Sequence, residues 1–452
     1  MMKINIAGLK VDAITKKELL DEVIGRIKRG QKTFVITPYS EFLYHSFQNP
    51  PLLEIFNRAD FSVADGIGLF WAKKFLDIPL TAKTYWGKVL QAAWQIKYSL
   101  AAIIFNPRWI KSALPEKIVG ADLVWDLAKL GADNNLSIFL LGGFGNTPEL
   151  AAKQLAQKFP VSKILGRGFS KPKTLRIAGS SNKNPDDLSV IKEINSANPD
   201  ILLVAYGPIK QEKWIAEHLQ NLNVKLAIGL GGTFDYIAGI KFTPPKFIRY
   251  SGLEWLWRLV TQPYRAKRIF NATFGLVWGL WHYKVFMSLP MRPNVAIIIF
   301  NQKKEILVCK RNPKDFNVDI VANTDMEKRQ NYWQFPQGGI DGNETIVEAA
   351  LREANEETGI VNLQFIKISK KTNSYLWGNG LRKFEKNKKF QNKGQVQHIA
   401  YFKFTGNQDK IKFYNNEFVN HKWVIAKDLD KIVTKEKAGL TKIVQEDLKD
   451  LA

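Results

Sequence analysis

The sequence is poor in the residues that cross-link a chain or anchor it to a metal. Its single cysteine, Cys309, excludes an internal disulfide and favours a reducing compartment. No histidine and cysteine spacing typical of a zinc site is present, and no repeat of 20 to 50 residues occurs. The first residues lack the long apolar region and cleavage site of a signal peptide, so we expect none. No Asp-x-Asp motif occurs before residue 290, so we expect no metal cofactor in that part.

Acidic residues are also scarce relative to basic ones, and the formal net charge is +24. Such an excess favours anionic partners, namely nucleic acid, phosphorylated substrates or an anionic membrane surface. A basic surface that serves only solubility remains the alternative. The length of 452 residues predicts two or three domains, and a hydrophobic content of 45% is enough to form their cores.

Prolines mark the main domain boundary. Pro290 and Pro293 disfavour a continuous helix and predict a linker, followed by a buried strand over residues 295–300. We therefore expect domains at residues 1–240 and 290–452, joined by a basic, tryptophan-rich appendage at residues 241–289. Residues 81–115 form an insertion in the first domain.

Apolar strand patterns alternate with helical patterns in the first domain. The predicted strands cover residues 33–36, 61–64, 137–141, 201–205 and 225–230. Thr147 followed by Pro148 predicts a helix start with Thr147 as the N-cap. The alternation indicates an α/β fold, a Rossmann-like, doubly wound and mainly parallel sheet with a helical basic appendage.

Glycines recur where these strands end. They let backbone amides approach a phosphate, and the following helix N-termini favour negative charge. An ordinary turn explains any one cluster, but their recurrence favours a nucleotide-diphosphate site at the carboxyl edge of the sheet. The glycines that we expect to bind substrate there are Gly66, Gly142, Gly143, Gly231 and Gly232.

Several motifs in this region resemble the WecG/TagA/CpsF glycosyltransferase family. They are Thr37-Pro38-Tyr39-Ser40-Glu41-Phe42, Ala64-Asp65-Gly66-Ile67-Gly68, Phe139-Leu140-Leu141-Gly142-Gly143, Gly207-Pro208-Ile209-Lys210-Gln211-Glu212-Lys213-Trp214, Gly231-Gly232-Thr233-Phe234-Asp235 and Gly252-Leu253-Glu254-Trp255-Leu256.

The resemblance implies inverting transfer of N-acetylmannosamine from a UDP-sugar donor to a polyprenyl-diphosphate-linked sugar acceptor, in cell-surface polysaccharide synthesis. The resemblance also implies that Gln211, Glu212 and Asp235 bind substrate. Asp65 matches the general base of the family and Thr37 its active-site partner. A carboxylate is also what chemistry requires, because it accepts the proton of the attacking hydroxyl. A turn or capping aspartate is the alternative for Asp65. Tyr39 departs from the usual asparagine, which leaves the donor sugar open.

The appendage is basic and aromatic, and in the resembling family it reaches the membrane. Arg249, Arg258, Arg265 and Arg268 are candidate contacts to the diphosphates. Residues 269–289 favour a helix that lies in the membrane interface over one that spans it. For the insertion at residues 81–115 we weigh a second interfacial element against a core-packed helical hairpin.

Acidic residues cluster near the other end of the chain. Glu353, Glu356 and Glu357 lie three and four residues apart, which places them on one helix face. Crowded carboxylates repel one another unless a divalent cation neutralises them, and hard oxygen ligands suit Mg²⁺ or Mn²⁺. A solvated acidic helix is the alternative.

The run from Gly338-Gly339 to Arg352-Glu353-Ala354-Asn355-Glu356-Glu357-Thr358-Gly359-Ile360 resembles the Nudix hydrolases. The resemblance implies an α/β/α Nudix fold with a mixed sheet. Its sites would be Glu353, Glu356 and Glu357 as catalytic metal ligands with Glu417, and Gly338, Gly339 and Arg352 at the substrate.

The octet that ends in Gly338-Gly339-Ile340 begins at Trp333. It resembles the RNA pyrophosphohydrolase and dinucleoside-polyphosphate hydrolase branch, so the substrate is either a nucleoside polyphosphate or an RNA 5′ end. The basic residues 382–393 suit such a substrate or form a solvated loop. The long stretch 312–331 leaves the choice of substrate open.

We therefore expect a bifunctional enzyme, cytoplasmic and peripheral on the inner face of the cell membrane. The alternative is a nucleotide-binding, membrane-docking N-terminal half with catalysis only in the Nudix half. A homo-oligomer is left open.

Overall fold

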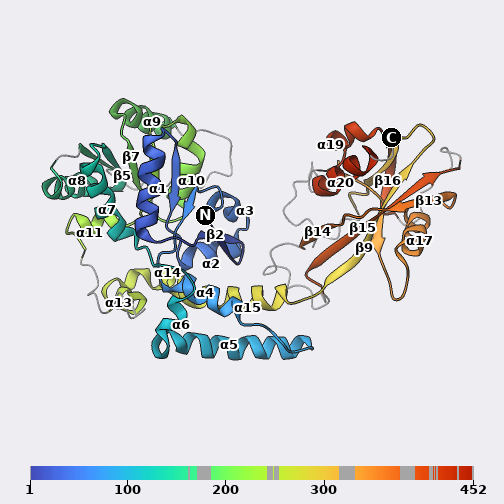
Figure 1. Ribbon diagram of the computed structural model, residues 1–452, viewed down its shortest axis with the longest axis horizontal. Coiled ribbons are helices and arrows are strands. Elements are labelled where there is room, and N and C mark those ends of the chain that lie inside the picture. Colours follow the sequence, from blue (N-terminus) through green and yellow to red (C-terminus); the bar gives the residue numbers. More distant parts are fainter. Residues whose placement is uncertain are drawn as a thin grey trace. The chain divides into compact units, whose positions relative to one another are not determined.

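The structure of the protein is a computed structural model. It describes residues 2–160, 163–169, 185–241, 248, 254–314, 331–376, 392–406, 411, 413, 416–434 and 437–449. The chain forms two compact units, Met1–Val285 and Phe286–Ala452. Each unit is described by itself (Figure 1).

Unit 1 is built on a six-stranded parallel sheet of order β4-β3-β8-β7-β5-β6. Its strands are β3 (Thr33–Ile36), β4 (Phe61–Ser62), β5 (Ile138–Phe144), β6 (Ile164–Phe169), β7 (Ile201–Ala205) and β8 (Leu226–Gly229). A two-stranded antiparallel hairpin, β1 (Lys3–Ile6) with β2 (Leu9–Asp12), precedes it. The central strands are buried on both faces, as expected of a parallel sheet covered by helices.

Helices connect the strands and cover the sheet (Figure 1). They are α1 (Lys16–Lys28), α2 (Ser40–Gln48), α3 (Pro51–Phe56), α4 (Ile67–Asp77), α5 (Tyr85–Phe105), α6 (Pro107–Lys111), α7 (Gly120–Asp133), α8 (Thr147–Lys158), α9 (Pro185–Ala197), α10 (Lys210–His218) with the 3₁₀ turn Leu219–Asn221, and α11 (Thr233–Ile237).

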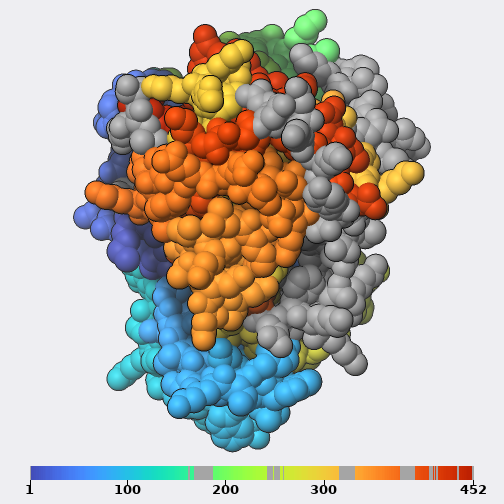
Figure 2. Space-filling model, turned by 90° about the vertical axis from the view of Figure 1, so that its right-hand side faces the viewer, coloured from blue at the N-terminus to red at the C-terminus, as the bar shows by residue number. Residues whose placement is uncertain are grey.

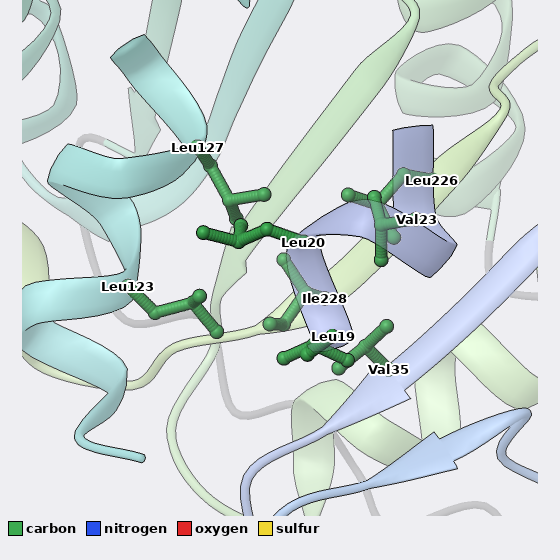
Figure 3. Close-up of a pocket in the computed structure, with 8 residues that line it drawn as sticks. All are labelled: Leu19, Leu20, Val23, Val35, Leu123, Leu127, Leu226 and Ile228. Carbon is green, nitrogen blue, oxygen red and sulfur yellow. The ribbon is translucent and has the colours of Figure 1, made fainter. Parts of the chain in front are cut away.

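The core of unit 1 lies where α1 and α7 pack on β3 and β8 (Figure 3). Leu19 and Val23 of α1 face Leu123 and Leu127 of α7 over Val35. The interior there is lined only by leucine, valine and isoleucine side chains, so it is a packed core and offers no polar group to a ligand.

The described part of the appendage is helical. It contains α13 (Glu254–Thr261), the 3₁₀ turn Pro263–Arg265, α14 (Ala266–Phe270), a π-helical segment η3 (Asn271–Gly275) and α15 (Leu276–Met287). Within the described part of the chain, no helix is both long and apolar enough to cross a membrane.

Unit 2 has a mixed sheet. The path β11-β10-β9-β15-β13 carries β12, β14 and β16 at its sides, and β9 pairs in parallel with β15 while the other pairs are antiparallel. Its elements are β9 (Met291–Phe300), β10 (Ile306–Arg311), β11 (Trp333–Gln334), β12 (Gln337–Gly339), α17 (Ile346–Thr358), β13 (Leu363–Ile368), β14 (Asn373–Leu376), β15 (Gly394–Phe404), β16 (Phe418–Val424), the 3₁₀ turn Ala426–Asp428, α19 (Leu429–Ile432) and α20 (Ala438–Lys449). Separate apolar clusters pack α17 on one face and α20 on the other, which gives an α/β/α arrangement.

The α/β fold predicted for both halves is confirmed, and β3 and β7 have their predicted bounds. The predicted start of α8 is wrong by one residue. Asn146 is the N-cap, and the Thr147 hydroxyl donates to the carbonyl of Phe144 (2.7 Å) instead of accepting from the helix.

Candidate functional site

Thr37 and Asp65 converge at the carboxyl edge of the sheet in unit 1. Thr37 follows β3, Asp65 follows β4, and both approach Gly120, the first residue of α7. The Gly120 N–H donates to Asp65 Oδ2 (3.2 Å). A Cβ built on Gly120 would lie 3.4 Å from Thr37 Oγ1 and 3.5 Å from Asp65 Oδ2, so both side chains lie within van der Waals distance of this position. The alternative interpretation, in which Asp65 caps a helix, also holds in part, because Asp65 accepts from the first N–H of α7. The helix that follows Asp65 in the chain, α4, has Gly66 as its N-cap.

Gln211 and Glu212 lie beneath the neighbouring loop and are buried. Gln211 Oε1 accepts from the Gly231 N–H (2.9 Å), and its amide donates to Glu212 Oε1 (2.7 Å). Glu212 Oε2 accepts from the N–H of Ile209 (2.6 Å), which has a φ of 70°. A branched residue is rare at positive φ, and such strain is often found at functional sites. The pair therefore fixes the backbone of two loops at the sheet edge.

Burial raises the pKa of Glu212 to about 7, and the nearby charge of Glu41 adds to this effect. Hydrogen bonds from Gln211 and Ile209 act in the opposite direction. Near neutral pH this carboxyl is therefore divided between its neutral and charged forms, which is uncommon for a glutamate.

Arg268 of α14 reaches back to the N-terminus of α2. Its Nε donates to both carboxylate oxygens of Glu41 (2.9 and 2.8 Å), and its Nη2 donates to the Tyr39 hydroxyl (2.6 Å). Tyr39 in turn donates to Glu41 Oε2 (2.5 Å). Burial alone would raise the pKa of Glu41, but contacts from His45, Arg268 and Tyr39 lower it to about 2. The guanidinium predicted to contact the diphosphates is thus engaged with this buried carboxylate.

The other predicted residues of this half lie around the same edge or outside the described part. Gly142 and Gly143 end β5 with φ of 95° and 88°, and Gly232 is the N-cap of α11. Asp235 pairs with Lys241 at the surface of that helix. Arg265 lies over the ring of Tyr264. Arg249, the side chain of Arg258 and most of the basic loop 382–393 and of the stretch 312–331 lie outside the described residues.

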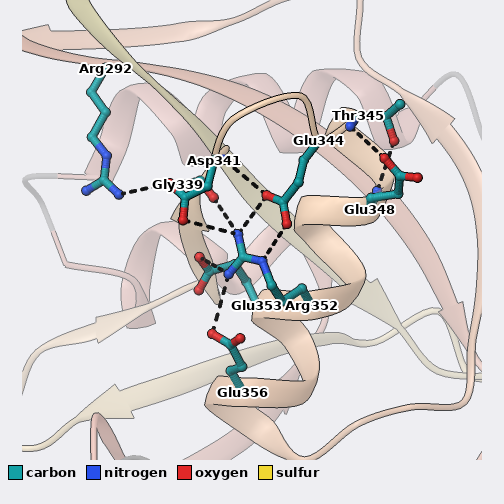
Figure 4. A network of polar contacts seen from close by, with 9 residues as sticks. All are labelled: Arg292, Gly339, Asp341, Glu344, Thr345, Glu348, Arg352, Glu353 and Glu356. Carbon is teal, nitrogen blue, oxygen red and sulfur yellow. Dashed lines mark hydrogen bonds and ion pairs between the residues drawn. The ribbon is translucent and has the colours of Figure 1, made fainter.

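In unit 2, helix α17 carries the acidic cluster (Figure 4). Thr345 and Glu348 form a capping box at its start, and Gly359, with a φ of 68°, ends it in the left-handed conformation that glycine adopts without a steric penalty. Arg352 lies at the centre of the polar network. It donates to both oxygens of Glu344 (2.7 and 2.9 Å) and to the Gly339 carbonyl (2.9 Å).

Arg352 also contacts two of the predicted metal ligands. Its Nη1 lies 2.9 Å from Glu353 Oε1 and 3.4 Å from Glu356 Oε2. Gly338 of β12 leaves space for the Glu353 carboxylate, because a Cβ at that position would lie 1.7 Å from Glu353 Cδ. Gly339 similarly leaves space for the Arg292 guanidinium.

The deeper side of α17 brings further carboxylates together. Glu357 is buried, and its Oε2 accepts from the Gln337 N–H (3.0 Å). Burial raises its pKa well above the ordinary value, and the charges of Glu417 and Glu353 raise it further. Burial and the charges of Glu356 and Glu417 likewise raise the pKa of Glu353, against the opposing effect of Arg352.

This donor set fits a divalent cation. Neighbouring carboxylates raise the pKa of both Glu353 and Glu357, a crowding of negative charge that a hard cation stabilises, and oxygen donors are those that Mg²⁺ and Mn²⁺ prefer. In the described residues no three acidic or histidine side chains already surround one point. Arg352, which holds Glu353 and Glu356, makes contacts that a bound cation would have to rearrange.

The two units thus define two enzyme domains, one with a substrate edge on a parallel sheet and one with a carboxylate-bearing helix in a mixed sheet. The family model "Glycosyl transferase WecG/TagA/CpsF family" matches residues 4–100 and 87–289, which is more than half of the sequence. The chain therefore belongs to the WecG/TagA/CpsF glycosyltransferase family. The NUDIX domain model matches residues 290–445. NUDIX domains use divalent metal ions; the predicted branch within them stays a prediction.

Curated relatives match the first part of the chain. An N-acetylglucosaminyldiphosphoundecaprenol N-acetyl-beta-D-mannosaminyltransferase of Staphylococcus aureus strain MRSA252 is 26% identical over 271 residues, which is 59% of this chain and 88% of the relative. The protein of the same description from strain NCTC 8325 / PS 47 is 25% identical over the same shares.

Solved structures match the second part. The MutT protein from Methanosarcina mazei Go1 is 16% identical with a TM-score of 0.27, over 36% of this chain and 96% of that one. The C. elegans Ap4A hydrolase is 19% identical with a TM-score of 0.25, over 36% of this chain and 99% of that one.

Two residues of the site were not predicted from the sequence. Gly120 belongs to none of the motifs named above. Its position at the start of a helix, directly after the apolar residues Ile118 and Val119, was the available signal. Glu41 belongs to the motif Thr37–Phe42 but was not predicted to have a role. An acidic residue among apolar neighbours indicates a buried ion pair, which could have identified it.

Proposed function

We propose that unit 1 transfers an N-acetylhexosamine, in the first instance N-acetylmannosamine, from a UDP-sugar to a polyprenyl-diphosphate-linked acceptor with inversion. The observation that carries the proposal is the convergence of Thr37 and Asp65 on Gly120, at the carboxyl ends of parallel strands. Ligands of such folds bind at this edge. The name of the S. aureus relatives, which describes transfer to a diphosphoundecaprenol-linked sugar, supports the substrate class.

In the proposed reaction, Asp65 accepts the proton of the acceptor hydroxyl while that oxygen attacks the anomeric carbon of the donor. UDP leaves from the opposite face of the sugar. Its developing charge meets backbone amides around Gly143 and Gly232, at the starts of α8 and α11. No metal is required of unit 1 in this scheme.

We propose further that unit 2 hydrolyses a nucleoside polyphosphate or a 5′-triphosphate RNA end. Glu353, Glu356, Glu357 and Glu417 would hold Mg²⁺ or Mn²⁺, which when bound polarises phosphate oxygens and activates water. Arg352, held by Glu344 and the Gly339 carbonyl, would orient Glu353 and Glu356 before the cation binds, and its contacts to these two carboxylates would rearrange on binding. Because the acceptor is lipid-linked, the enzyme would work as a peripheral protein on the inner face of the membrane.

Asp65→Asn tests the transferase. We expect loss of sugar transfer from UDP-N-acetylmannosamine, read by mass spectrometry of the lipid product, with UDP binding retained. Asp77→Asn, which removes a carboxylate paired with Lys73 at the end of α4, should transfer as the wild type does. Wild-type turnover by Asp65→Asn would refute the assignment of the base.

Glu356→Gln tests the hydrolase. We expect it to eliminate Mg²⁺-dependent release of phosphate or pyrophosphate from diadenosine tetraphosphate and 5′-triphosphate RNA. The matched control, Glu446→Gln, removes an exposed carboxylate paired with Lys371 and should stay active. Hydrolysis by the wild-type chain without any sugar transfer would support the alternative in which unit 1 is a docking module.

A further inference from the structure

Helix α5 packs on unit 1 with its smaller and more polar face. Its buried residues are Ala92, Gln95, Ser99 and Ala102. Gln95 donates to the carbonyl of Pro79 (2.9 Å), and the Ser99 hydroxyl accepts from the Trp71 indole (3.0 Å). This is the reverse of an ordinary surface helix, which buries its large apolar residues.

The large side chains of α5 point to the solvent. Trp86, Leu90, Trp94 and Tyr98 follow one another at four-residue intervals, so they share one face, and they are between 58% and 71% exposed. This α5 ladder extends for about 18 Å along the helix. Figure 2 shows the light-blue atoms of this segment at the surface of the molecule.

A second exposed ladder lies on the appendage. Phe270, Phe274 and Trp278 are also four residues apart and are between 57% and 60% exposed. The two helices are connected, because the Trp281 indole donates to the carbonyl of Val89 in α5 (3.3 Å). In Figure 1, α5 and the appendage helices gather at the same end of unit 1.

Glycines fix the appendage in this orientation. A Cβ on Gly275 would lie 2.6 Å from the ring of Tyr44, and a Cβ on Gly279 would lie 2.3 Å from the ring of Phe47. Both rings belong to α2, so the glycine face of the appendage is closely packed on it, and the aromatic ladder lies on another face.

The charges around the α5 ladder have one sign. No aspartate or glutamate occurs between Asp77 and Glu116. The basic residues in that interval are Lys83, Lys88, Lys97, Arg108 and Lys111. Lys97 lies with its Nζ 5.3 Å from the Trp94 ring, so its stem follows the aromatic surface while its charge stays outside. Tryptophan and tyrosine beside lysines are typical of helices in a membrane interface.

The appendage is the element that reaches the membrane in the resembling family, whereas α5 lies in the insertion at residues 81–115. From these observations we infer that α5 is a further docking surface for an anionic lipid bilayer, beside the appendage ladder, and that it lies in the headgroup region. The inference rests on the proposed function in one respect, namely that the proposed acceptor is lipid-linked and therefore lies at the membrane. Charge complementarity selects the bilayer over a second copy of the chain, because two copies meeting at this face would bring like charges together.

The experiment is flotation of the full chain with phosphatidylglycerol-rich vesicles and with vesicles of phosphatidylcholine alone. We expect binding to the first, weaker binding to the second, and weakening by salt. Trp86→Gln/Trp94→Gln should lower the partition coefficient by about tenfold for each tryptophan removed. The matched control is Leu188→Gln/Val361→Gln, which removes exposed apolar side chains outside the ladders and should bind as the wild type does.

Equal binding by the ladder variant and the wild type, with unchanged circular dichroism, would overturn the inference. So would a wild-type dimer that the ladder variant converts to a monomer while neither form binds vesicles. Sugar transfer to a short, water-soluble acceptor separates this inference from the proposed function. Transfer without vesicle binding refutes the docking surface alone, and vesicle binding without transfer refutes the transferase alone.

Discussion

Replacing Gly338 by alanine should damage the hydrolase far more than the fold. The new Cβ would lie 1.7 Å from Glu353 Cδ and 2.1 Å from its Oε1, so the carboxylate has to move by about 2 Å to reach an ordinary contact distance. The moving atoms are the end of a flexible side chain. The cost in folding free energy is therefore at the low end of the overpacking range, about 1 kcal/mol.

Activity should respond differently, because Glu353 is a proposed metal ligand. A displacement of about 1 Å in a catalytic group costs on the order of 100-fold in rate, which corresponds to about 2.7 kcal/mol of transition-state stabilisation. We expect kcat/KM for diadenosine tetraphosphate to fall by about that factor or more. The Mg²⁺ concentration for half-maximal rate should rise as well.

Gly342→Ala provides the matched control. Gly342 has a φ of 55° and nothing within 4 Å of a built Cβ, so the change adds only backbone strain of about 1–2 kcal/mol. Its hydrolysis rate and Mg²⁺ dependence should remain close to the wild type at a similar loss of thermal stability. If Gly338→Ala instead keeps the wild-type rate and Mg²⁺ dependence, the Glu353 carboxylate is not needed where the structure places it.

Two further predictions concern unit 1. Arg268→Met should lower its free energy of unfolding by about 1–3 kcal/mol, since it leaves the buried Glu41 carboxylate without a cation while Arg268 itself is partly exposed. Calorimetry measures this loss of unfolding free energy. Adding Glu41→Gln to Arg268→Met should restore part of it, whereas losses from the two substitutions that simply add would contradict the prediction. Glu212 has a folded pKa of about 7 against 4.5 in the unfolded chain, so its contribution is complete below about pH 4.5 and is lost as the pH rises through 7. Between pH 5 and 8 the free energy of unfolding of the wild type should therefore fall by about 2.5 kcal/mol more than that of Glu212→Gln, and parallel pH profiles of the two free energies would refute this.

The regular elements with strong local patterns were predictable from the sequence. The strands β3 and β7 have their predicted bounds because their apolar runs are buried on both faces. The strand β4 is shorter than predicted, Phe61–Ser62, since it is an edge strand and pairs with its one neighbour, β3, at only two residues. The start of α8 was misplaced because the Thr147 hydroxyl found a carbonyl acceptor in the preceding turn.

The site was predictable only in part. The spacing of glutamates on α17 and the left-handed stop at Gly359 follow from helical periodicity and glycine chemistry, which are local properties. The requirement for glycine at Gly338 is not local, since it depends on a side chain of α17 that packs over β12. Likewise no pattern pairs Glu41 with Arg268, which lie 227 residues apart in the chain.

By itself, then, the sequence determined the two α/β halves, the acidic helix and the glycine-bearing strand ends, because periodicity and backbone chemistry act over a few residues. Only the tertiary structure decided which faces meet. The large side chains of α5 point to the solvent because Ala92, Gln95 and Ser99 form the face of this helix that packs on unit 1. The tertiary structure also brought Thr37, Asp65 and Gly120 together, because the carboxyl ends of parallel strands meet at a common edge of the sheet.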